Sequence, residues 1–349
     1  MVLAKTVLAA VALAMVALGA VLLLLAGPWF TGSAVAAAVT PAAVNGGNAT
    51  STGTPAMSSV DALVLGVVEG VTEFLPISST GHLLVTGRLL GLDGNDVADP
   101  VAAEAAKDAF DSYAIAIQAG AILAVLALYW RRVLSILQGL VGRDPDGRTL
   151  ALNLLVAFVP AALIGLVAEG SIKARLFQPW AIALAWAVGG LAILIVERRR
   201  ATVGSDRPGS DRVGAGGLSL EHLRWRPALI IGVAQAFAMW PGTSRSLVTI
   251  LAGMAVGLSV AAAVELSFLL GLLTLGAATA YEGLSNGSVM VDAYGVGRPL
   301  LGLLAALVSA FLAVRWMVGW LQSRGLEVFG WYRLGAAGVL VALLAVGSV

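Results

Sequence analysis

The sequence predicts an all-α protein that crosses a membrane several times. Of its 349 residues 59% are hydrophobic and only 12% are charged, whereas soluble domains carry about 25% charged residues. Apolar runs of roughly 20 residues, the length at which a helix crosses the hydrocarbon core of a bilayer, recur along the chain. Because so few charges cannot cover an aqueous surface, we expect lipid to contact most of the molecule.

Seven apolar runs are long enough to be full transmembrane helices. They cover residues 7–26, 113–130, 149–169, 178–196, 262–282, 298–320 and 330–348. Two further apolar stretches, 60–91 and 227–258, are interrupted near the middle by proline, glycine, serine and threonine. The pieces on either side of each interruption are marginal for spanning and suit re-entrant half-helices.

Arginines predict which ends of the spans face the cytoplasm, because short cytoplasmic loops are rich in basic residues. They gather after the spans that end at 130 and 196, and Arg324, with Arg333 near it, marks the loop before the last span. The acidic loop expected at 92–112 then lies outside. Lys173 and Arg175, in a short connection, count mildly against this scheme.

This topology predicts an inverted repeat. The stretch 60–91 must begin and end outside and 227–258 inside, so the two enter the membrane from opposite faces. Each is followed by three full spans, so each repeat comprises a re-entrant helix pair plus three transmembrane helices. The string that ends at Glu69 matches the one that ends at Gln235, and Ser79 aligns with Ser244 after a gap of one residue.

The membrane domain is expected at 58–349, with one repeat at about 58–197 and the other at about 226–349. An arginine-rich cytoplasmic loop at 198–225 joins them. Residues 1–57 stand apart. Their apolar run is a signal peptide or an uncleaved anchor, and its length favours an anchor because cleaved signals have shorter apolar cores. The small and polar residues that follow predict a disordered linker.

Two carboxylates and a histidine lie in the first interrupted stretch, where ionisable groups are costly and usually mark function. Glu69 and Glu73 are four residues apart, so on a helix both carboxylates lie on one face. Their mutual repulsion is relieved when a cation sits between them, and oxygen ligands of this kind suit Mg²⁺ or Ca²⁺. The pair is therefore a candidate site for a divalent cation.

The remaining polar groups predict phosphate chemistry. Ser79 and His82 are three residues apart, so the pair could act as nucleophile and base, or as phosphate ligand and acid. Arg245, in the second stretch, is permanently charged and suited to phosphate oxygens. Half-helices that begin after Pro76 and Pro241 present free N–H groups to an anion. Together with the carboxylates, these groups form an inventory for phosphoryl transfer.

Neighbouring polar residues are expected to bind the phosphates of the substrate. They are Ser78, Thr80, Gln235, Gly242, Ser244, Ser246 and Thr249. Other interpretations stay open for several residues. The two glutamates could pair with Arg245 as a structural ion bridge, serines near 78–80 could cap a half-helix, and His82 could be an ordinary buried histidine. Glu265 either belongs to the start of a helix or reaches the site.

The string LGVVEGVTEFLPISSTGH at 65–82 closely resembles the bacterial undecaprenyl-diphosphatase family, also called bacitracin-resistance proteins. The string PGTSRS at 241–246, followed by Thr249, resembles that family's other motif. Residues 117–123 and 265–270 resemble its membrane segments. The resemblance covers about 60–348, and residues 1–57 have no usual counterpart in it.

The resemblance implies removal of the terminal phosphate from undecaprenyl pyrophosphate, which returns the lipid carrier to cell-wall synthesis. It implies that Glu69, Glu73, Ser79 and His82 form the catalytic group and that Arg245 holds the pyrophosphate. It further implies a divalent cation and an active site open to the outer face of the bacterial plasma membrane.

The net charge and the motifs also indicate the expected partners and an alternative function. A net charge of +1 predicts no basic surface for nucleic acid, so the expected partners are membrane lipids and the polyprenyl substrate, with a homodimer possible. The main alternative is a transporter or flippase of a polyprenyl phosphate, because secondary transporters use inverted repeats with broken helices. A carrier of an anion has little use for Glu69, Glu73 and a Ser79–His82 pair, which favours the enzyme.

Overall fold

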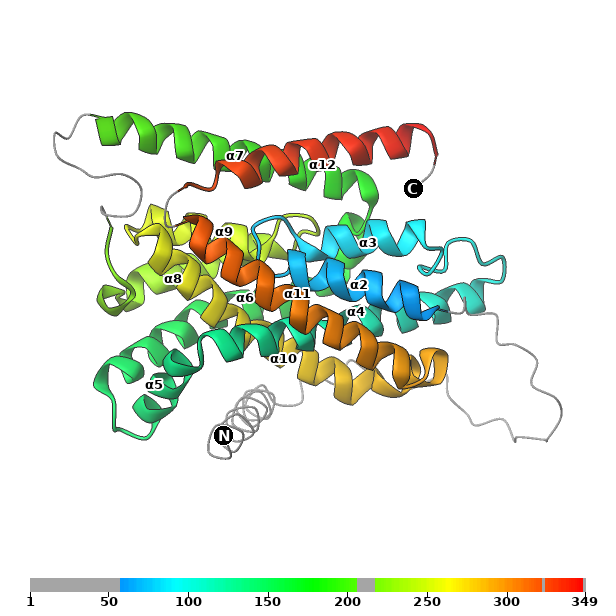
Figure 1. Ribbon diagram of the computed structural model, residues 1–349, viewed down its shortest axis with the longest axis horizontal. Helices are drawn as coiled ribbons and strands as arrows, with labels where there is room; N and C mark the ends of the chain where they lie inside the picture. Colours follow the sequence, from blue (N-terminus) through cyan, green and yellow to red (C-terminus); the bar gives the residue numbers. More distant parts are fainter. Residues whose placement is uncertain (1–56, 206–216, 322–323, 348–349) are drawn as a thin grey trace.

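The structure, a computed structural model, describes residues 57–205, 217–321 and 324–347. These residues form an all-helical protein, in which the one β-bridge joins Leu218 to Leu258 (Figure 1). The predicted all-α class is confirmed. The expected anchor and nearly all of the linker lie outside the described residues, as does the middle of the arginine-rich loop.

Eleven α-helices and two short 3-10 helices make up the described chain. They are α2 (Ser59–Thr72), α3 (Ser79–Leu89), α4 (Pro100–Leu128), α5 (Trp130–Leu140), α6 (Pro145–Leu176), α7 (Pro179–Ser205), η2 (Leu220–His222), α8 (Trp225–Gln235), η3 (Ala236–Met239), α9 (Arg245–Ala255), α10 (Val260–Tyr294), α11 (Gly297–Leu321) and α12 (Glu327–Ala345). Six of them, α4, α6, α7, α10, α11 and α12, are long and apolar enough to cross a membrane. Each overlaps one of the six spans predicted after residue 57, so the chain is a multi-pass membrane protein.

Two regions expected to be loops are partly helical. The acidic region at 92–112 is irregular only as far as Asp99, whose carboxylate accepts a hydrogen bond from the N–H of Val101 at 3.3 Å. Pro100 then takes the first position of α4, and alanines continue the helix. The arginine-rich connection after α4 contains α5. The prediction was wrong there because hydropathy marks only the part of a helix that lies in lipid.

Small residues bring α2 close to α11. Gly66 and Gly70, one turn apart, face Gly302 and Ala306, and a side chain at either position would collide with the backbone of α11. Small residues at such spacing let helices in a membrane approach closely. This packing holds the C-terminal end of α2, and with it Glu73, at the centre of the molecule.

The two predicted interruptions separate α2 from α3 and η3 from α9. Pro76 and Pro241 each lack an N–H and disfavour helical geometry in the preceding residue, so a helix cannot run through them. Ser78 and Ser244 then adopt φ angles of 76° and 74°, and within the described ranges they are the only residues other than glycine with positive φ. Each caps the following helix through its side chain.

The matching backbone conformations correct the alignment drawn from the sequence. Ser244 corresponds to Ser78, not to Ser79, and the spacing between them equals that between Glu69 and Gln235. No gap is needed at the serines. Arg245 therefore corresponds to Ser79, since each is the first residue of the half-helix that follows its interruption.

The interruptions contact each other at the centre of the molecule. The hydroxyl of Ser246 donates to the carbonyl of Leu75 at 2.8 Å, and the ring of Phe74 packs edge-on against Phe268 of α10. A side chain beside the second interruption therefore reaches the backbone of the first.

Candidate active site

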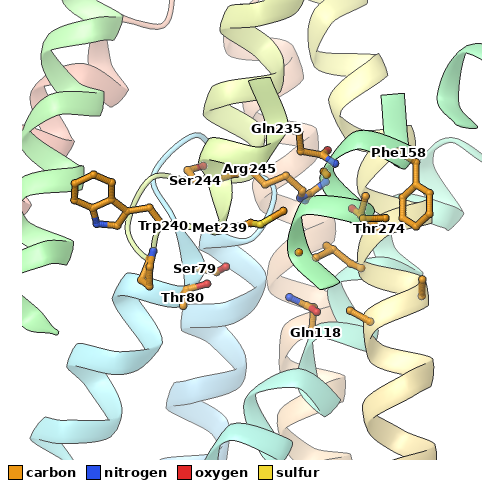
Figure 2. Close-up of a pocket in the computed structure, with 18 of the residues that line it drawn as sticks. Ser79, Thr80, Gln118, Phe158, Gln235, Met239, Trp240, Ser244, Arg245 and Thr274 are labelled. Carbon is orange, nitrogen blue, oxygen red and sulfur yellow. The ribbon is translucent and has the colours of Figure 1, made fainter. Parts of the chain in front are cut away.

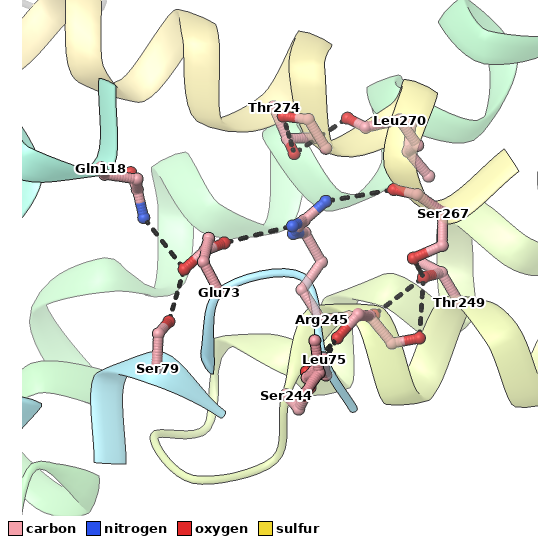
Figure 3. Close-up of polar contacts among 12 residues, drawn as sticks. Glu73, Leu75, Ser79, Gln118, Ser244, Arg245, Thr249, Ser267, Leu270 and Thr274 are labelled. Atoms are coloured by element: carbon pink, nitrogen blue, oxygen red, sulfur yellow. Dashed lines mark hydrogen bonds and ion pairs between the residues drawn. The ribbon is translucent and has the colours of Figure 1, made fainter. Parts of the chain in front are cut away.

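Glu73, the residue after α2, is the centre of a polar network (Figure 3). Its Oε1 accepts a hydrogen bond from Nη2 of Arg245 at 3.1 Å. Its Oε2 accepts from the hydroxyl of Ser79 and from Nε2 of Gln118, the latter at 3.4 Å. The three donors come from α9, α3 and α4, so this one carboxylate joins three helices.

Arg245 keeps hydrogen-bonding capacity after its contact with Glu73. Its Nη1 donates to the carbonyl of Ser267 at 3.2 Å, and its guanidinium lies over the ring of Phe74. Its buried Nε has no hydrogen-bond partner among the described residues. Gly271 packs against the guanidinium, where a side chain would collide with it. The site therefore holds a fixed cation whose guanidinium suits an anion.

The sequence led us to expect contact between Ser79 and His82, but the two side chains bond to different partners. The hydroxyl of Ser79 donates to Glu73. Nδ1 of His82 lies 2.6 Å from the carbonyl of Ser78, and its Nε2 lies 2.8 Å from the hydroxyl of Tyr332 on α12. A carbonyl only accepts, so Nδ1 carries a proton and Nε2 accepts from the tyrosine in the neutral ring. Both nitrogens are thus occupied away from Ser79.

A cavity of about 680 Å³ lies beside Glu73, Ser79 and Arg245 (Figure 2). The predicted residues Ser78, Thr80, Gln235, Gly242 and Ser244 also line it. Its other walls are mostly apolar side chains of α6, η3 and α10, among them Phe158, Leu163, Leu166, Met239 and Leu275. One polar end and long apolar walls suit a ligand with an anionic head and a hydrocarbon body.

A second cavity of about 500 Å³ shares Ser79, Thr80 and Gln118 with the first. Its acidic lining residues are Glu69, Asp108, Asp111 and Glu282. Glu69 is 1% exposed, and neither of its carboxylate oxygens has a hydrogen-bond partner within the described part of the chain. A buried carboxylate without partners is costly unless a cation or proton satisfies it, so Glu69 fits the predicted cation site.

Glu73 fits that cation site less well, because its oxygens already accept three hydrogen bonds. No group of three or more histidine, cysteine, aspartate or glutamate side chains able to hold a metal occurs in the ranges that the structure describes. A cation at Glu69 would therefore need further oxygen ligands from hydroxyls, amides or the substrate.

Two predicted phosphate ligands lie beside the cavity and not in its lining. Thr249 is fully buried, and its hydroxyl bonds to the carbonyl of Arg245 and to Ser267. Ser246 bonds to Leu75 and Ser244. In this structure both residues hold α9 in place.

The family described as bacitracin resistance protein BacA matches residues 62–339. The chain belongs to this family. It is 43% identical over 288 residues to the undecaprenyl-diphosphatase of Sorangium cellulosum, covering 81% of this chain and 85% of the relative. It is 42% identical over 290 residues to undecaprenyl-diphosphatase 2 of Rhodospirillum rubrum, covering 83% and 96%. The resemblance drawn from the motifs is confirmed.

One open question about this BacA family member is resolved by an ion pair. Glu265 pairs with Nε of Arg132 at 2.5 Å, and Nη2 of Arg132 also contacts Glu221 at 2.5 Å. Glu265 lines neither of the two cavities described above. It ties α10 to α5 and η2 and does not reach the site.

Three residues of the site were missed by reasoning from sequence. Gln118 was part of a resembling segment but had no assigned role, and it bonds to Glu73. Tyr332 bonds to His82. Arg333 was interpreted as a marker of the cytoplasmic loop, but it is fully buried. The available signal was its position inside the apolar run 330–348, where a charge usually has a function.

Proposed function

We propose that this protein hydrolyses undecaprenyl pyrophosphate to undecaprenyl phosphate and inorganic phosphate. The observation that carries the proposal is that Ser79 and Arg245, from different interruptions, both bond to Glu73 at the polar end of a largely apolar cavity. Relatives whose alignments cover over 80% of this chain carry the name undecaprenyl-diphosphatase. The lipid carrier is thereby recycled for cell-wall synthesis, which accounts for the family's link to bacitracin resistance.

Glu73 is the proton acceptor that the hydrogen bonds favour. The Ser79 oxygen attacks the terminal phosphorus, the bond from phosphorus to the bridging oxygen breaks, and the hydroxyl proton passes to Glu73. Water then attacks the phosphorus, the bond to the Ser79 oxygen breaks as phosphate leaves, and Glu73 returns the proton to that oxygen. In a direct version Ser79 orients a water molecule for the same attack. Trapping labelled phosphate on Ser79 separates the two versions.

Arg245 lines the cavity and stabilises the charge that develops on the phosphoryl oxygens. His82 was expected to act as acid or base. Its bonds to Ser78 and Tyr332 favour a different role, in which it holds the turn before α3. Thr80, Gln235 and Ser244 line the cavity within the same polar region.

A divalent cation, Mg²⁺ or Ca²⁺, would be held by Glu69 on the side of the acidic cavity, with Glu73 adjacent. It would neutralise part of the negative charge on the pyrophosphate. The carboxylates of the acidic cavity provide an approach for a cation that avoids the apolar walls of the lipid cavity.

The inverted repeat is part of the proposal. Its support is that helices at equivalent places in the two halves make equivalent contacts. The first helix of each half packs on a helix of the other half, α2 on α11 and α8 on α6. The equivalent helices α7 and α12 pack on each other, and so do α4 and α10. The matching conformations of Ser78 and Ser244 agree with it. With arginine-rich connections in the cytoplasm, the site opens to the outer face of the bacterial plasma membrane.

The function is tested by measuring phosphate release from undecaprenyl pyrophosphate by the purified protein in nanodiscs, with and without a chelator. We expect release that stops on chelation and returns with Mg²⁺ or Ca²⁺. The alternative, a flippase, predicts movement of undecaprenyl phosphate across sealed vesicles with no release of phosphate. That result would overturn the proposal.

A further inference from the structure

Arg333 of α12 is a buried cation that bonds only to backbone carbonyls among the described residues. It is 0% exposed. Its Nη1 donates to Pro76 at 3.2 Å, and its Nη2 donates to Gly242 at 2.8 Å and to Ala185 at 2.9 Å. Its Nε donates to Trp186 at 3.4 Å. One side chain therefore joins both interruptions to α7.

The two carbonyls at the interruptions need such a donor. Pro76 and Gly242 lie where helical geometry is lost, so their carbonyls have no partner further along a helix. A buried carbonyl without a partner is costly, and more so in a membrane. The planar guanidinium offers several donors in fixed directions, so it can satisfy carbonyls from separate segments at once.

The position of the guanidinium is restricted by its surroundings. Gly189 of α7 packs directly against it, and any side chain at that position would collide with the guanidinium. The carbonyls of Ala185 and Trp186 come from the same helix, one turn before Gly189. Because α7 contacts the guanidinium at three positions in neighbouring turns, Arg333 fixes the two interruptions relative to this helix.

The two carbonyls that Arg333 binds lie just before the site residues in the chain. Pro76 and Gly242 each precede by two residues the serine that caps the next helix. The first residues of those helices, Ser79 and Arg245, both bond to Glu73. A shift of one interruption against the other would therefore separate the serine from the arginine.

We propose that Arg333 is a positioning residue that sets the register between the two interruptions and so keeps Ser79 and Arg245 on the same carboxylate. The inference deepens the proposed function, on which its kinetic part rests. Arg333 lines neither cavity and touches no reacting atom. α12 lies along α7 at the edge of the bundle (Figure 1). Arg333 therefore acts on the site through the carbonyls that it binds.

The kinetic test compares Arg333→Lys and Arg333→Met with Arg315→Met, which removes an exposed arginine of α11. A misplacement of about 1 Å can cost about 100-fold in rate. We expect kcat for phosphate release to fall about 100-fold in Arg333→Met and less in Arg333→Lys, with KM changed only a few-fold. Arg315→Met should match the parent. A parent-like kcat in Arg333→Met would overturn the proposal.

A distance measurement tests the positioning role without substrate. The chain has no cysteine, so spin labels at Leu89→Cys on α3 and Ala255→Cys on α9 report on the two half-helices alone. Both positions are exposed. We expect a narrow distance distribution in the parent and in Ser79→Ala, and a broad or shifted one in Arg333→Met. An unchanged distribution in Arg333→Met would overturn the proposal even if activity were lost.

A second variant covers the case in which Arg333→Met does not fold. Gly189→Ala leaves Arg333 present but forces its guanidinium to move. We expect the same broadening and the same fall in kcat, in a protein that still elutes as a single species. A narrow distribution with parent-like kcat would contradict the proposal. Because this measurement needs no turnover, its failure is distinguishable from failure of the proposed function.

Discussion

The hydroxyl of Ser79 donates to Glu73, on the far side of the interruption, while His82, one turn along the same helix, bonds elsewhere. Ser79 and His82 of one half-helix therefore have different roles, and Ser79 is joined across the interruption to Glu73. The proton path of the proposed reaction starts from this contact.

Glu73→Gln should retain the shape of the site but lose its base. We expect kcat for phosphate release to fall about 10²- to 10⁴-fold, the usual contribution of a general base. The matched control is Glu104→Gln on the exposed start of α4, which should leave kcat unchanged. If Glu73→Gln kept more than a tenth of the parental kcat, Glu73 would not be the proton acceptor.

His82→Gln and Tyr332→Phe should cost stability more than rate. His82→Gln removes the bonds to Ser78 and Tyr332, whereas Tyr332→Phe removes only the bond between α12 and His82. Each bond is typically worth about 1 kcal/mol of unfolding free energy. We expect a lower midpoint of thermal unfolding and a kcat within about 10-fold of the parent. A loss of kcat as large as that in Glu73→Gln would instead assign the acid or base role to His82.

Gln118 should support Glu73 through a defined orientation. The hydroxyl of Thr279 donates to its Oε1 at 3.3 Å, which leaves Nε2 directed at Glu73. Thr279→Val should lower kcat about five-fold, the equivalent of one hydrogen bond. Gln118→Glu places a second carboxylate against Glu73 and should lower it further through repulsion. Equal rates in Gln118→Glu and the parent would show that the contact is unimportant.

Acid should weaken the contact between η2 and α5. Hydrogen bonds from its own backbone N–H and from Arg132 hold the pKa of Glu221 at about 2, against an ordinary value of 4.5. A carboxylate with a lowered pKa stabilises the folded state above pH 4.5, and this contribution is lost as pH falls towards 2. Because the pair is partly exposed, it is worth less than about 1 kcal/mol.

The check is thermal unfolding of the parent and Glu221→Gln at pH 7 and pH 3. The parent should be slightly more stable at pH 7, and the difference should shrink at pH 3. Glu197→Gln, in an ion pair on α7, is the control for general charge effects. A difference that grows on acidification would contradict the role of the Arg132–Glu221 pair.

Much of the fold follows from local sequence. Apolar length predicted all six spans of the described chain, and proline with glycine predicted both interruptions. Charge within apolar runs identified Glu69, Glu73 and Arg245. These signals are local because a helix in lipid must be long, apolar and hydrogen-bonded within itself, and each of these requirements is met within one segment of sequence.

The remaining features depend on contacts between distant segments. The alignment of Ser78 with Ser244 rests on a backbone angle that the surrounding structure imposes. His82 bonds to Tyr332, 250 residues away, and the carbonyls that Arg333 contacts lie 91 to 257 residues from it. An arginine near a span end resembles a topology marker, and only the packing of α12 on α7 shows that Arg333 is buried.

The central claim is that residues of both interruptions act on one phosphate as a unit. The most direct test is a double-mutant cycle on phosphate release from undecaprenyl pyrophosphate, with Ser79→Ala, Arg245→Lys and the double variant. Groups that act as a unit are strongly non-additive, so the double variant should be scarcely slower than the slower single variant. Fully additive losses would mean that the two interruptions act independently, which would contradict the account.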